Sequence, residues 1–418
     1  MPETTIDGPV VIVGSGLAGG NAAVSLREKG FTGPIILVGR ETRVAYGRPP
    51  LSKTYLRGEE DLSGWYVKPT DWYDTHDVEL RTHVSMQGVE TDTKHVRLDD
   101  GGSLAYDKLI LCTGGRPRTL TVDGADLAGV HVLRTVADCD AIKAAARPGV
   151  RAVVVGMGFI GSEVAASLRQ MGLAVTAVLT GAFPLQTVLG DEVGSVMRAI
   201  HEAHGVELVP EDRVAAFEGS DHLERVVTAN GRRIECELAV VGLGIEPDID
   251  AVESTAIALS NGILVDERCR TNIADVYAAG DVANHLHPVF GRVRVEHYNN
   301  AEKQGRAAAR SVLGSTEAYA DIHTFWSDQF EHNLEYVGLA RDWDQFVVRG
   351  SIEERRFLGF YLKGGVLTAA MGLNRGGDPE LDEDSELRAC QRLIAERAPL
   401  SPATLADEHV DLHSPPGV

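Results

Sequence analysis

The sequence predicts an α/β fold that contains two similar strand–helix–strand units and a C-terminal α+β domain. Two observations predict the units: a GxGxxG turn follows a short apolar run at Gly14–Gly19, and a second one does so at Gly156–Gly161. Each turn opens a helical pattern, as expected where a buried parallel strand leads into a helix. A third observation predicts the α+β domain, because short alternating segments typical of antiparallel strands begin after about residue 320.

The first unit is expected to combine two separate stretches of the chain. Its strands are predicted at Val10–Val13, Ile35–Val38, 104–111 and 273–279, and its helices at 18–29 and 300–313. The second unit repeats the pattern, with strands at 152–155, 174–179 and 238–242 and a helix at 162–171. In the C-terminal domain, strands are expected at 335–339, 346–349 and 357–362, before a helix at 386–396.

Glycine and proline mark two crossings between these units, at 112–117 and again at 244–247. The predicted domains are therefore 1–112 together with 245–322, then 113–244, and finally 323–418. Such a division suits a chain of 418 residues, which is too long for one ordinary core.

The formal net charge of -21 disfavours nucleic acid or an anionic membrane as the main partner. There is no signal-peptide pattern and no apolar run long enough to cross a bilayer, so a cytoplasmic protein is expected. The five cysteines show neither a CxxC pair nor metal-ligand spacing, and they are Cys112, Cys139, Cys236, Cys269 and Cys390. No metal site is expected, and any redox chemistry must be carried by a bound organic cofactor.

The glycine turns predict two bound dinucleotides, because backbone N–H groups at each helix N-terminus can approach a pyrophosphate. The segment Thr271–Asp281 adds a strand that ends in Gly280-Asp281. A carboxylate placed there can hold the ribityl hydroxyls of a flavin, and a nearby helix dipole can hold its diphosphate. Two dinucleotides in one chain indicate electron transfer between them.

Across nearly its whole length the chain resembles flavoprotein reductases of the putidaredoxin reductase type, which include Rieske dioxygenase ferredoxin reductases and rubredoxin reductases. It is more distantly similar to apoptosis-inducing factor. Besides the second glycine turn extended to Glu163, the resemblance rests on four motifs: Arg48–Lys53, Thr271–Asp281, Val295–Ala301 and Phe325–Gln329. It implies two Rossmann-like domains of the glutathione reductase type, with FAD in the first domain and NADH in the middle one. It also implies a C-terminal domain that helps to dock a [2Fe–2S] ferredoxin, or a rubredoxin.

The resemblance assigns site residues one by one. The residues expected to contact FAD are Gly14, Gly16, Leu17, Ala18, Gly19, Glu41, Arg48, Pro49, Lys53, Val84, Thr113, Gly114, Arg134, Asp281, Glu296, His297 and Tyr298. Those expected to contact NADH are Gly156, Gly158, Phe159, Ile160, Gly161, Glu163 and Gly244. Lys53 and Glu163 are further expected to act as a catalytic pair, in which the Lys53 ammonium favours the reduced flavin and the Glu163 carboxylate orients the lysine. A plain salt bridge remains the alternative for this pair.

Two departures from the family pattern concern ribose recognition. Arg40 occupies the usual position of the acid that contacts the adenosine ribose of FAD, and Glu41 beside it is expected to take over. In the middle domain, Leu179 stands where relatives carry the acid that binds the NADH ribose and repels the 2′-phosphate of NADPH. NADH is still the expected donor, with NADPH left open.

Two other functions remain open at this stage. An NADH oxidase, a peroxidase or a disulfide reductase would need a reactive cysteine beside the flavin, and the loop at 44–46 has none. A non-catalytic flavin-binding protein would not need the Lys53/Glu163 pair.

Overall fold

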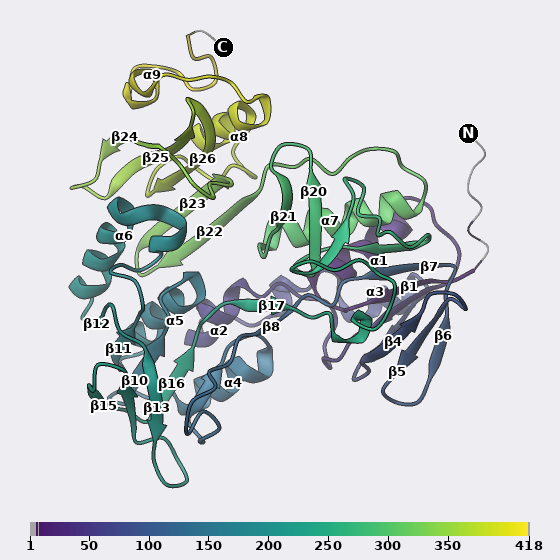
Figure 1. The fold of residues 1–418 in the computed structure, drawn as a ribbon, viewed down its shortest axis with the longest axis horizontal. Coiled ribbons are helices and arrows are strands. Elements are labelled where there is room, and N and C mark those ends of the chain that lie inside the picture. The colour runs from purple at the N-terminus through teal and green to yellow at the C-terminus, as the bar shows by residue number, and fades with distance from the viewer. Residues whose placement is uncertain (1–5, 7, 417–418) are drawn as a thin grey trace. The chain divides into compact units, whose positions relative to one another are not determined.

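The computed structural model describes residues 6 and 8–416. Each glycine turn follows a strand of a different five-stranded parallel sheet (Figure 1). The chain divides into two compact units. The first unit takes the described chain up to Gly47, then Leu62–Arg116 and Glu246–His323, and the second takes Arg48–Asp61, Pro117–Ile245 and the described residues from Thr324 onward. The division of the chain into three domains at the boundaries given above remains a prediction.

The first unit is built on a parallel sheet with the strand order β19-β7-β1-β2-β3. Its strands are β1 (Val10–Val13), β2 (Ile35–Val38), β3 (Val78–Arg81), β7 (Lys108–Leu111) and β19 (Val276–Ala278). All residues of β1, β2, β7 and β19 are buried. One face of this sheet packs against helices and the other against antiparallel strands, so its strands are buried on both faces and are mostly apolar. This burial explains why the sequence predicts β1 and β2 with their correct bounds.

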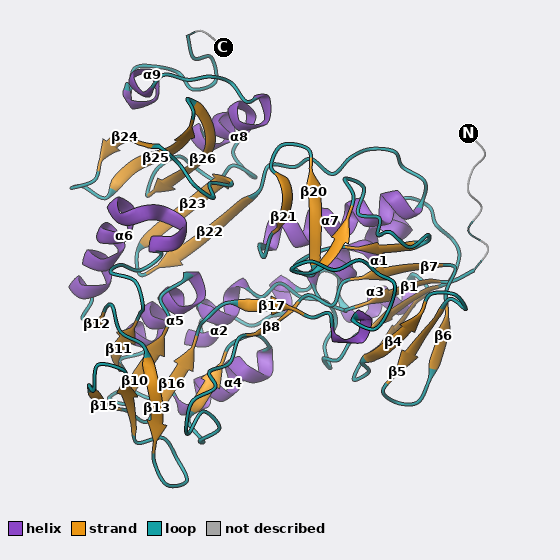
Figure 2. Cartoon of the chain, viewed as in Figure 1, coloured by secondary structure: helices purple, strands orange, loops and turns teal. Residues whose placement is uncertain are grey.

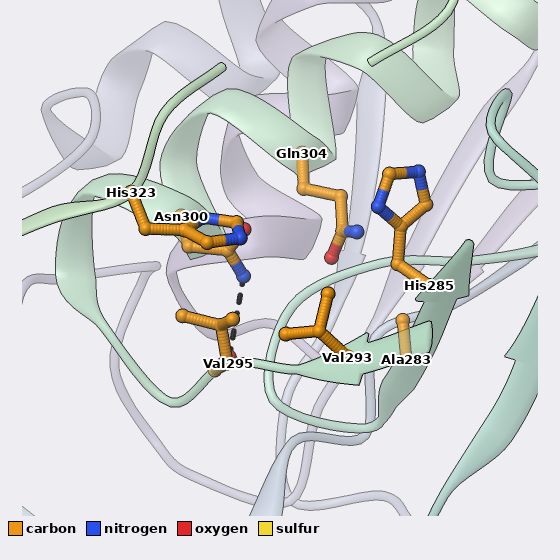
Figure 3. Close-up of a pocket in the computed structure, with 7 residues that line it drawn as sticks. All are labelled: Ala283, His285, Val293, Val295, Asn300, Gln304 and His323. Atoms are coloured by element: carbon orange, nitrogen blue, oxygen red, sulfur yellow. Dashed lines mark hydrogen bonds between the residues drawn. The ribbon is translucent and has the colours of Figure 1, made fainter. Parts of the chain in front are cut away.

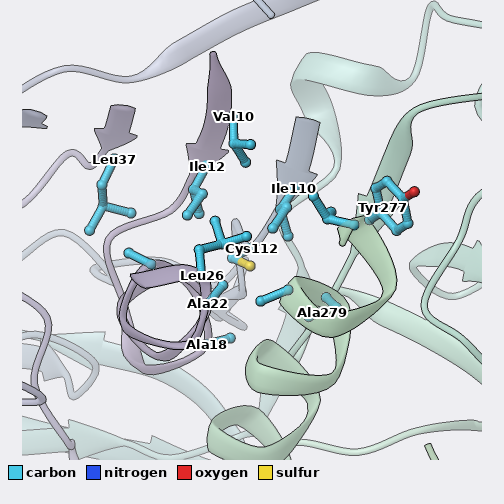
Figure 4. Close-up of a cluster of buried hydrophobic side chains, with 14 of the residues drawn as sticks. Val10, Ile12, Ala18, Ala22, Leu26, Leu37, Ile110, Cys112, Tyr277 and Ala279 are labelled. Atoms are coloured by element: carbon cyan, nitrogen blue, oxygen red, sulfur yellow. The ribbon is translucent and has the colours of Figure 1, made fainter. Parts of the chain in front are cut away.

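Helices α1 (Leu17–Glu28) and α7 (Tyr298–Val312) pack against each other beside this sheet (Figure 4). Their backbones come very close, since a Cβ atom on Gly305 would lie 2.2 Å from the carbonyl oxygen of Ala18. Ala22 and Ala308 are fully buried in the same core. Small side chains on both helices therefore allow the close approach.

Smaller elements complete the first unit. An antiparallel sheet contains β4 (Met86–Glu90), β5 (His95–Leu98) and β6 (Ser103–Ala105). A mixed sheet contains β18 (Ile263–Val265), which is parallel to β20 (Ala283–His287), and β21 (Gly291–Arg294), which is antiparallel to β20. The unit also contains the short helix α3 (Thr70–Thr75).

The second unit contains the other parallel sheet, with the order β12-β11-β10-β16-β9. Its strands are β9 (Val130–Val132), β10 (Arg151–Val155), β11 (Ala174–Val178), β12 (Glu207–Val209) and β16 (Leu238–Val241). The helices of this part are α2 (Thr54–Arg57), α4 (Val136–Ala145), α5 (Phe159–Gln170) and α6 (Gln186–Ala203). An antiparallel meander is formed by β13 (Val214–Glu218), β14 (Arg225–Thr228) and β15 (Arg233–Glu235).

The C-terminal part of the second unit is an antiparallel sheet with helices, as predicted (Figure 2). Its strand order is β22-β23-β26-β25-β24. The strands are β22 (Thr324–Gln329), β23 (His332–Gly338), β24 (Gln345–Ser351), β25 (Arg356–Lys363) and β26 (Val366–Leu373), followed by α8 (Glu386–Glu396) and α9 (Pro402–Ala406). Helix α8 packs on β23 and β26.

Two predicted strands differ from the structure by more than a shift of their end residues. The segment 104–111 is divided between β6 and β7, because the backbone N–H of Asp107 turns away to the carbonyl of Pro9. The segment 273–279 becomes a strand only at Val276, because Asp275 before it has a φ of 67° and pairs with Lys94 and Lys108.

The chain crosses between the units within β8 (Gly115–Pro117) and β17 (Ile245–Pro247), both at segments where glycine and proline predict a crossing. Among the described residues, no helix is both long and apolar enough to cross a membrane.

Candidate functional site

At the first glycine turn, the first and third glycines are packed tightly against backbone atoms, and the middle glycine faces open space. Gly14 has a φ of 106°, and a Cβ atom there would lie 2.0 Å from the carbonyl oxygen of Cys112. A Cβ on Gly19 would lie 1.9 Å from the carbonyl oxygen of Gly14. At Gly16, a Cβ would have no atom of the described residues within 4 Å. Leu17 and the buried Ala18 then begin α1.

The second glycine turn repeats this geometry. Gly156 has a φ of 90°, and a Cβ there would lie 2.5 Å from the carbonyl oxygen of Gly242. A Cβ on Gly161 would lie 1.9 Å from the carbonyl oxygen of Gly156, whereas one on Gly158 would meet no described atom within 4 Å.

Both turns therefore leave room for a ligand at the N-terminus of a helix. Gly16 and Gly158 are the N-cap residues of α1 and α5, and neither helix has a described acidic side chain in its first turn. Free backbone N–H groups, the positive end of a helix dipole and open space at the middle glycine fit the pyrophosphate of a dinucleotide. The residues present thus fit FAD at one turn and NADH at the other.

Arg40 and Glu41 both lie beyond the end of β2 and have partners. Arg40 forms an ion pair with Asp248, whose backbone N–H donates to the carbonyl of Gly114 at 3.0 Å. The hydroxyl of Thr113 donates to the carbonyl of the same aspartate at 2.6 Å. Glu41 accepts a hydrogen bond of 2.6 Å from the hydroxyl of Tyr46 through Oε2. The arginine at the usual acid position is therefore neutralised by an acid from a distant part of the chain.

Three more of the predicted FAD residues lie around the N-terminus of α7. Glu296 pairs with Arg294 at 2.8 Å. His297 is the N-cap residue, and desolvation lowers its pKa to about 4 although the nearby charge of Asp281 opposes this shift. The ring of Tyr298 forms an edge-to-face contact with Trp65, with centroids 6.1 Å apart.

The remaining predicted FAD residues are divided between the units. Val84, in the first unit, donates its backbone N–H to the carbonyl of Gly39 at 3.1 Å. Arg48, Pro49 and Arg134 belong to the second unit, where the Arg48 guanidinium donates to the carbonyl of Arg134 at 2.6 Å. Pro49 begins a 3-10 turn that ends just before Lys53.

The structure brings Lys53 and Glu163 together in the interior of the second unit. Lys53 Nζ lies 2.9 Å from Glu163 Oε2, and both residues are buried, with 8% and 3% of their surface exposed. Lys53 Nζ also donates to the carbonyl of Pro49 at 3.3 Å. A buried ion pair of this kind needs further hydrogen bonds to offset the loss of hydration of both charges.

Two serines that the sequence analysis gave no role supply those bonds. Ser52 donates to Glu163 Oε2, and Ser327 donates to Glu163 Oε1 at 2.7 Å. Both serines lie inside motifs of the resemblance, at Arg48–Lys53 and Phe325–Gln329. Their place in those motifs is the only signal in the sequence, because nothing in the spacing shows that they meet Glu163.

The other residues assigned to NADH lie around the second turn. Ile160 is 46% exposed, and Phe159 packs edge-to-face on Phe325 at 4.7 Å between centroids. Gly244 has a φ of 79° and an open Cβ position within the described structure. At the end of β11, Leu179 is only 4% exposed and the next residue, Thr180, is exposed and uncharged.

All five cysteines are buried. Burial raises the pKa of the thiols of Cys112, Cys139 and Cys236 to about 12, and it raises the pKa of the other two further still. A thiol is nucleophilic only as the thiolate, so these side chains are chemically inert at neutral pH.

A group of buried histidines in the first unit is not predicted by the sequence analysis. His285 and His323 line a small pocket with Asn300 and Gln304 (Figure 3). Neither ring nitrogen of His323 has a hydrogen-bond partner among the described residues, and its pKa lies well below the ordinary value because burial disfavours the charged ring. Burial likewise lowers the pKa of His285, and of His201 in the second unit, to about 4.

These histidines predict a loss of stability in mild acid. The unfolded chain protonates these rings below about pH 6.5, whereas in the folded chain His285 and His201 resist protonation until about pH 4. Stability should therefore be retained above pH 6.5 and fall as the pH drops toward 4, by roughly 3 kcal/mol for each of His285 and His201, and His323 contributes in the same direction. Thermal unfolding measured between pH 7.5 and about 4.5 checks this window.

The variant His323→Leu should lose less Tm than the wild type across that window, and the exposed His409→Gln should behave as the wild type. An equal acid-induced loss in His323→Leu would show that this ring does not contribute.

Known proteins resemble this chain over nearly its full length. Residues 8–305 match the pyridine nucleotide-disulphide oxidoreductase family, and residues 324–415 match the reductase C-terminal family. The chain is 37% identical to rhodocoxin reductase of Rhodococcus erythropolis, over 96% of this chain and 93% of that protein. It is also 37% identical to the ferredoxin–NAD(+) reductase component of the anthranilate 1,2-dioxygenase system of Burkholderia cepacia, over 97% and 98% of the two chains. The crystal structure of the covalent putidaredoxin reductase–putidaredoxin complex matches with a TM-score of 0.92 at 33% identity, over 98% of each chain.

Proposed function

Because this chain belongs to the family of FAD-dependent ferredoxin reductases of the putidaredoxin reductase type, we propose that it passes electrons from NADH to a [2Fe–2S] ferredoxin that serves an oxygenase. The observation that most directly supports the proposal is the pair of glycine turns. In each turn the first and third glycines are tightly packed, and the middle one, Gly16 or Gly158, faces open space. Bound FAD supplies the chemistry, since it accepts two electrons together and releases them singly.

The chain's own residues bind and orient the two dinucleotides. We assign the FAD pyrophosphate to the N-terminus of α1, and the ribityl hydroxyls to Asp281 beside α7. We assign the NADH pyrophosphate to the N-terminus of α5. We further assign the adenosine ribose of FAD to Glu41.

Lys53 and Glu163 are proposed to promote flavin reduction. A buried ammonium held by a carboxylate is a preorganised positive charge, which stabilises negative charge that develops next to it. The carboxylate keeps the lysine in one orientation and offsets part of its charge, so the field of the pair depends on its geometry.

The proposed function is tested by steady-state reduction of cytochrome c with NADH, in the presence and absence of purified [2Fe–2S] ferredoxins and a rubredoxin. We expect strong stimulation by a [2Fe–2S] ferredoxin. If neither kind of partner stimulates the reaction, the ferredoxin reductase function is refuted and a flavin-binding role without an electron acceptor is favoured.

An oxidase, a peroxidase or a disulfide reductase is disfavoured by the buried thiols with raised pKa values. We place the protein in the cytoplasm as part of the same proposal.

Leu179 is proposed to weaken the discrimination between NADH and NADPH. We expect Leu179→Glu to raise the ratio of kcat/KM for NADH to that for NADPH about tenfold, because a carboxylate there binds ribose hydroxyls and repels a 2′-phosphate. The isosteric control Leu179→Gln should change the ratio much less. Equal effects of both variants on both nucleotides would place the ribose elsewhere.

A further inference from the structure

The Lys53–Glu163 pair is the end of a longer chain of buried polar side chains within the second unit. Glu163 uses its two oxygens differently. Its Oε2 receives Lys53 and Ser52, whereas its Oε1 receives only Ser327, at 2.7 Å, in the part of the chain that the structure describes. Ser327 belongs to β22, a strand of the C-terminal sheet. The rotation of the Glu163 carboxylate about its Cγ–Cδ bond therefore depends on that strand.

Two more buried side chains stand behind Ser327. Gln329 Nε2 donates to Ser327 Oγ at 3.0 Å, and His201 Nε2 lies 2.9 Å from Gln329 Oε1. Ser327 and Gln329 are each 1% exposed, and His201 is fully buried. Because the amide oxygen of Gln329 can only accept, His201 must carry its proton on Nε2.

The three hydrogen bonds from His201 to Glu163 are thus all directed toward the carboxylate. His201 donates to Gln329, Gln329 donates to Ser327, and Ser327 donates to Glu163. Burial lowers the pKa of His201 to about 4, so this series of hydrogen bonds begins at a neutral ring and brings no second cation near the pair. Aligned hydrogen bonds in a medium of low dielectric polarise and strengthen one another.

We infer that Ser327, supported by Gln329 and His201, is a positioning residue that holds Glu163 Oε1 so that Oε2 remains on Lys53. The inference rests on the proposed function, because the role of the pair in flavin reduction comes from there. Ser327 acts through Glu163 and sets how much of the carboxylate charge opposes the charge of Lys53.

A merely structural role is the alternative, and the chain offers a matched control for it. Thr228 donates its hydroxyl to the carboxylate of Asp212, and both residues are buried in the second unit. Thr228→Val therefore removes a donor from a buried carboxylate that is not Glu163, just as Ser327→Ala removes one from Glu163.

Stopped-flow reduction of the holoenzyme by NADH is the first test. We expect Ser327→Ala to slow flavin reduction about tenfold while the Kd for NADH stays unchanged, and Ser327→Thr to restore most of the rate. Gln329→Leu should show a smaller loss in the same direction, which keeps the test decisive if Ser327→Ala does not fold. Thr228→Val should lower Tm but be reduced at the wild-type rate. Wild-type reduction rates in both Ser327→Ala and Gln329→Leu, with a lowered Tm, would overturn the inference.

The midpoint potential of the flavin is the second readout and does not use NADH. Ser327→Ala removes a hydrogen-bond donor that disperses part of the Glu163 charge. The carboxylate beside Lys53 is then more negative, so the potential should become more negative, whereas Glu163→Gln should make it more positive. Thr228→Val should leave it unchanged. A potential that is the same in Ser327→Ala and wild type overturns the inference. If NADH fails to reduce even the wild-type holoenzyme, the proposed function fails, and the potentials of these variants still decide the role of Ser327.

Discussion

Replacing Lys53 by alanine should slow the reduction of bound FAD by NADH about a hundredfold, while the protein still retains its FAD. The ammonium is 2.9 Å from Glu163 Oε2 and largely shielded from water, so its removal deletes a fixed positive charge and leaves a buried carboxylate without its cation. The unpaired carboxylate should also cost about 3–5 kcal/mol of stability. Stopped-flow absorbance of the flavin and thermal unfolding measure the two effects separately.

The double variant Lys53→Ala/Glu163→Gln separates stability from rate. With the carboxylate neutralised, the Tm should recover toward the wild-type value, but the rate should not. Lys143 provides the control, since its Nζ also donates to a backbone carbonyl of the second unit, that of Tyr55, at 3.1 Å. Lys143→Ala should be reduced as fast as the wild type. If NADH reduces the bound FAD of Lys53→Ala as fast as that of the wild type, the pair is only a salt bridge that contributes to stability.

The second large effect is expected at the first glycine turn, where two neighbouring glycines should fail in different ways. Gly19→Ala places a methyl group 1.9 Å from the carbonyl oxygen of Gly14, so α1 cannot keep its position and the first unit should not fold. Gly16→Ala has no such clash, and its φ of -80° suits alanine. Its methyl group instead fills the space in front of the helix N-terminus, so we expect a normal fold with FAD affinity lowered about a hundredfold.

The ratio of flavin to protein absorbance and the Tm of each purified variant test this distinction. Gly64→Ala is the control, because a Cβ there also has no described atom within 4 Å and the residue lies outside both glycine turns. Gly16→Ala that binds FAD as tightly as the wild type would show that the pyrophosphate does not approach this turn.

The sequence predicts those parts of the fold that local patterns determine. Fully buried strands such as Val10–Val13 appear as apolar runs, and the helix at Glu386–Glu396 appears with its correct bounds. Sequence analysis does not predict α6, although Leu189, Val193 and Met197 recur at intervals of four and are all buried. Gly190, with a φ of 82° inside that helix, interrupts the helical pattern.

The site shows where sequence analysis reaches its limit. The glycine turns are predictable because the chemistry of a tight turn requires glycine at fixed spacing. The partners of Glu163 are not, because Ser52 and Ser327 come from segments that are 111 and 164 residues away from it. Likewise, the aspartate that neutralises Arg40 lies 208 residues further along the chain. Such partners follow from tertiary packing, which no local pattern records.

The close packing of α1 and α7 has a consequence for how the protein is made. The core of the first unit contains Ala22 and Leu26 from α1, but also Ala308 and Val312 from α7, and β19 completes the edge of its sheet. During synthesis, α1 leaves the ribosome long before α7 exists, so its apolar face stays uncovered while the whole intervening segment is translated. The N-terminal unit is therefore expected to complete its core only after about residue 312 has emerged, and release of a chain that stops earlier should yield an aggregation-prone fragment.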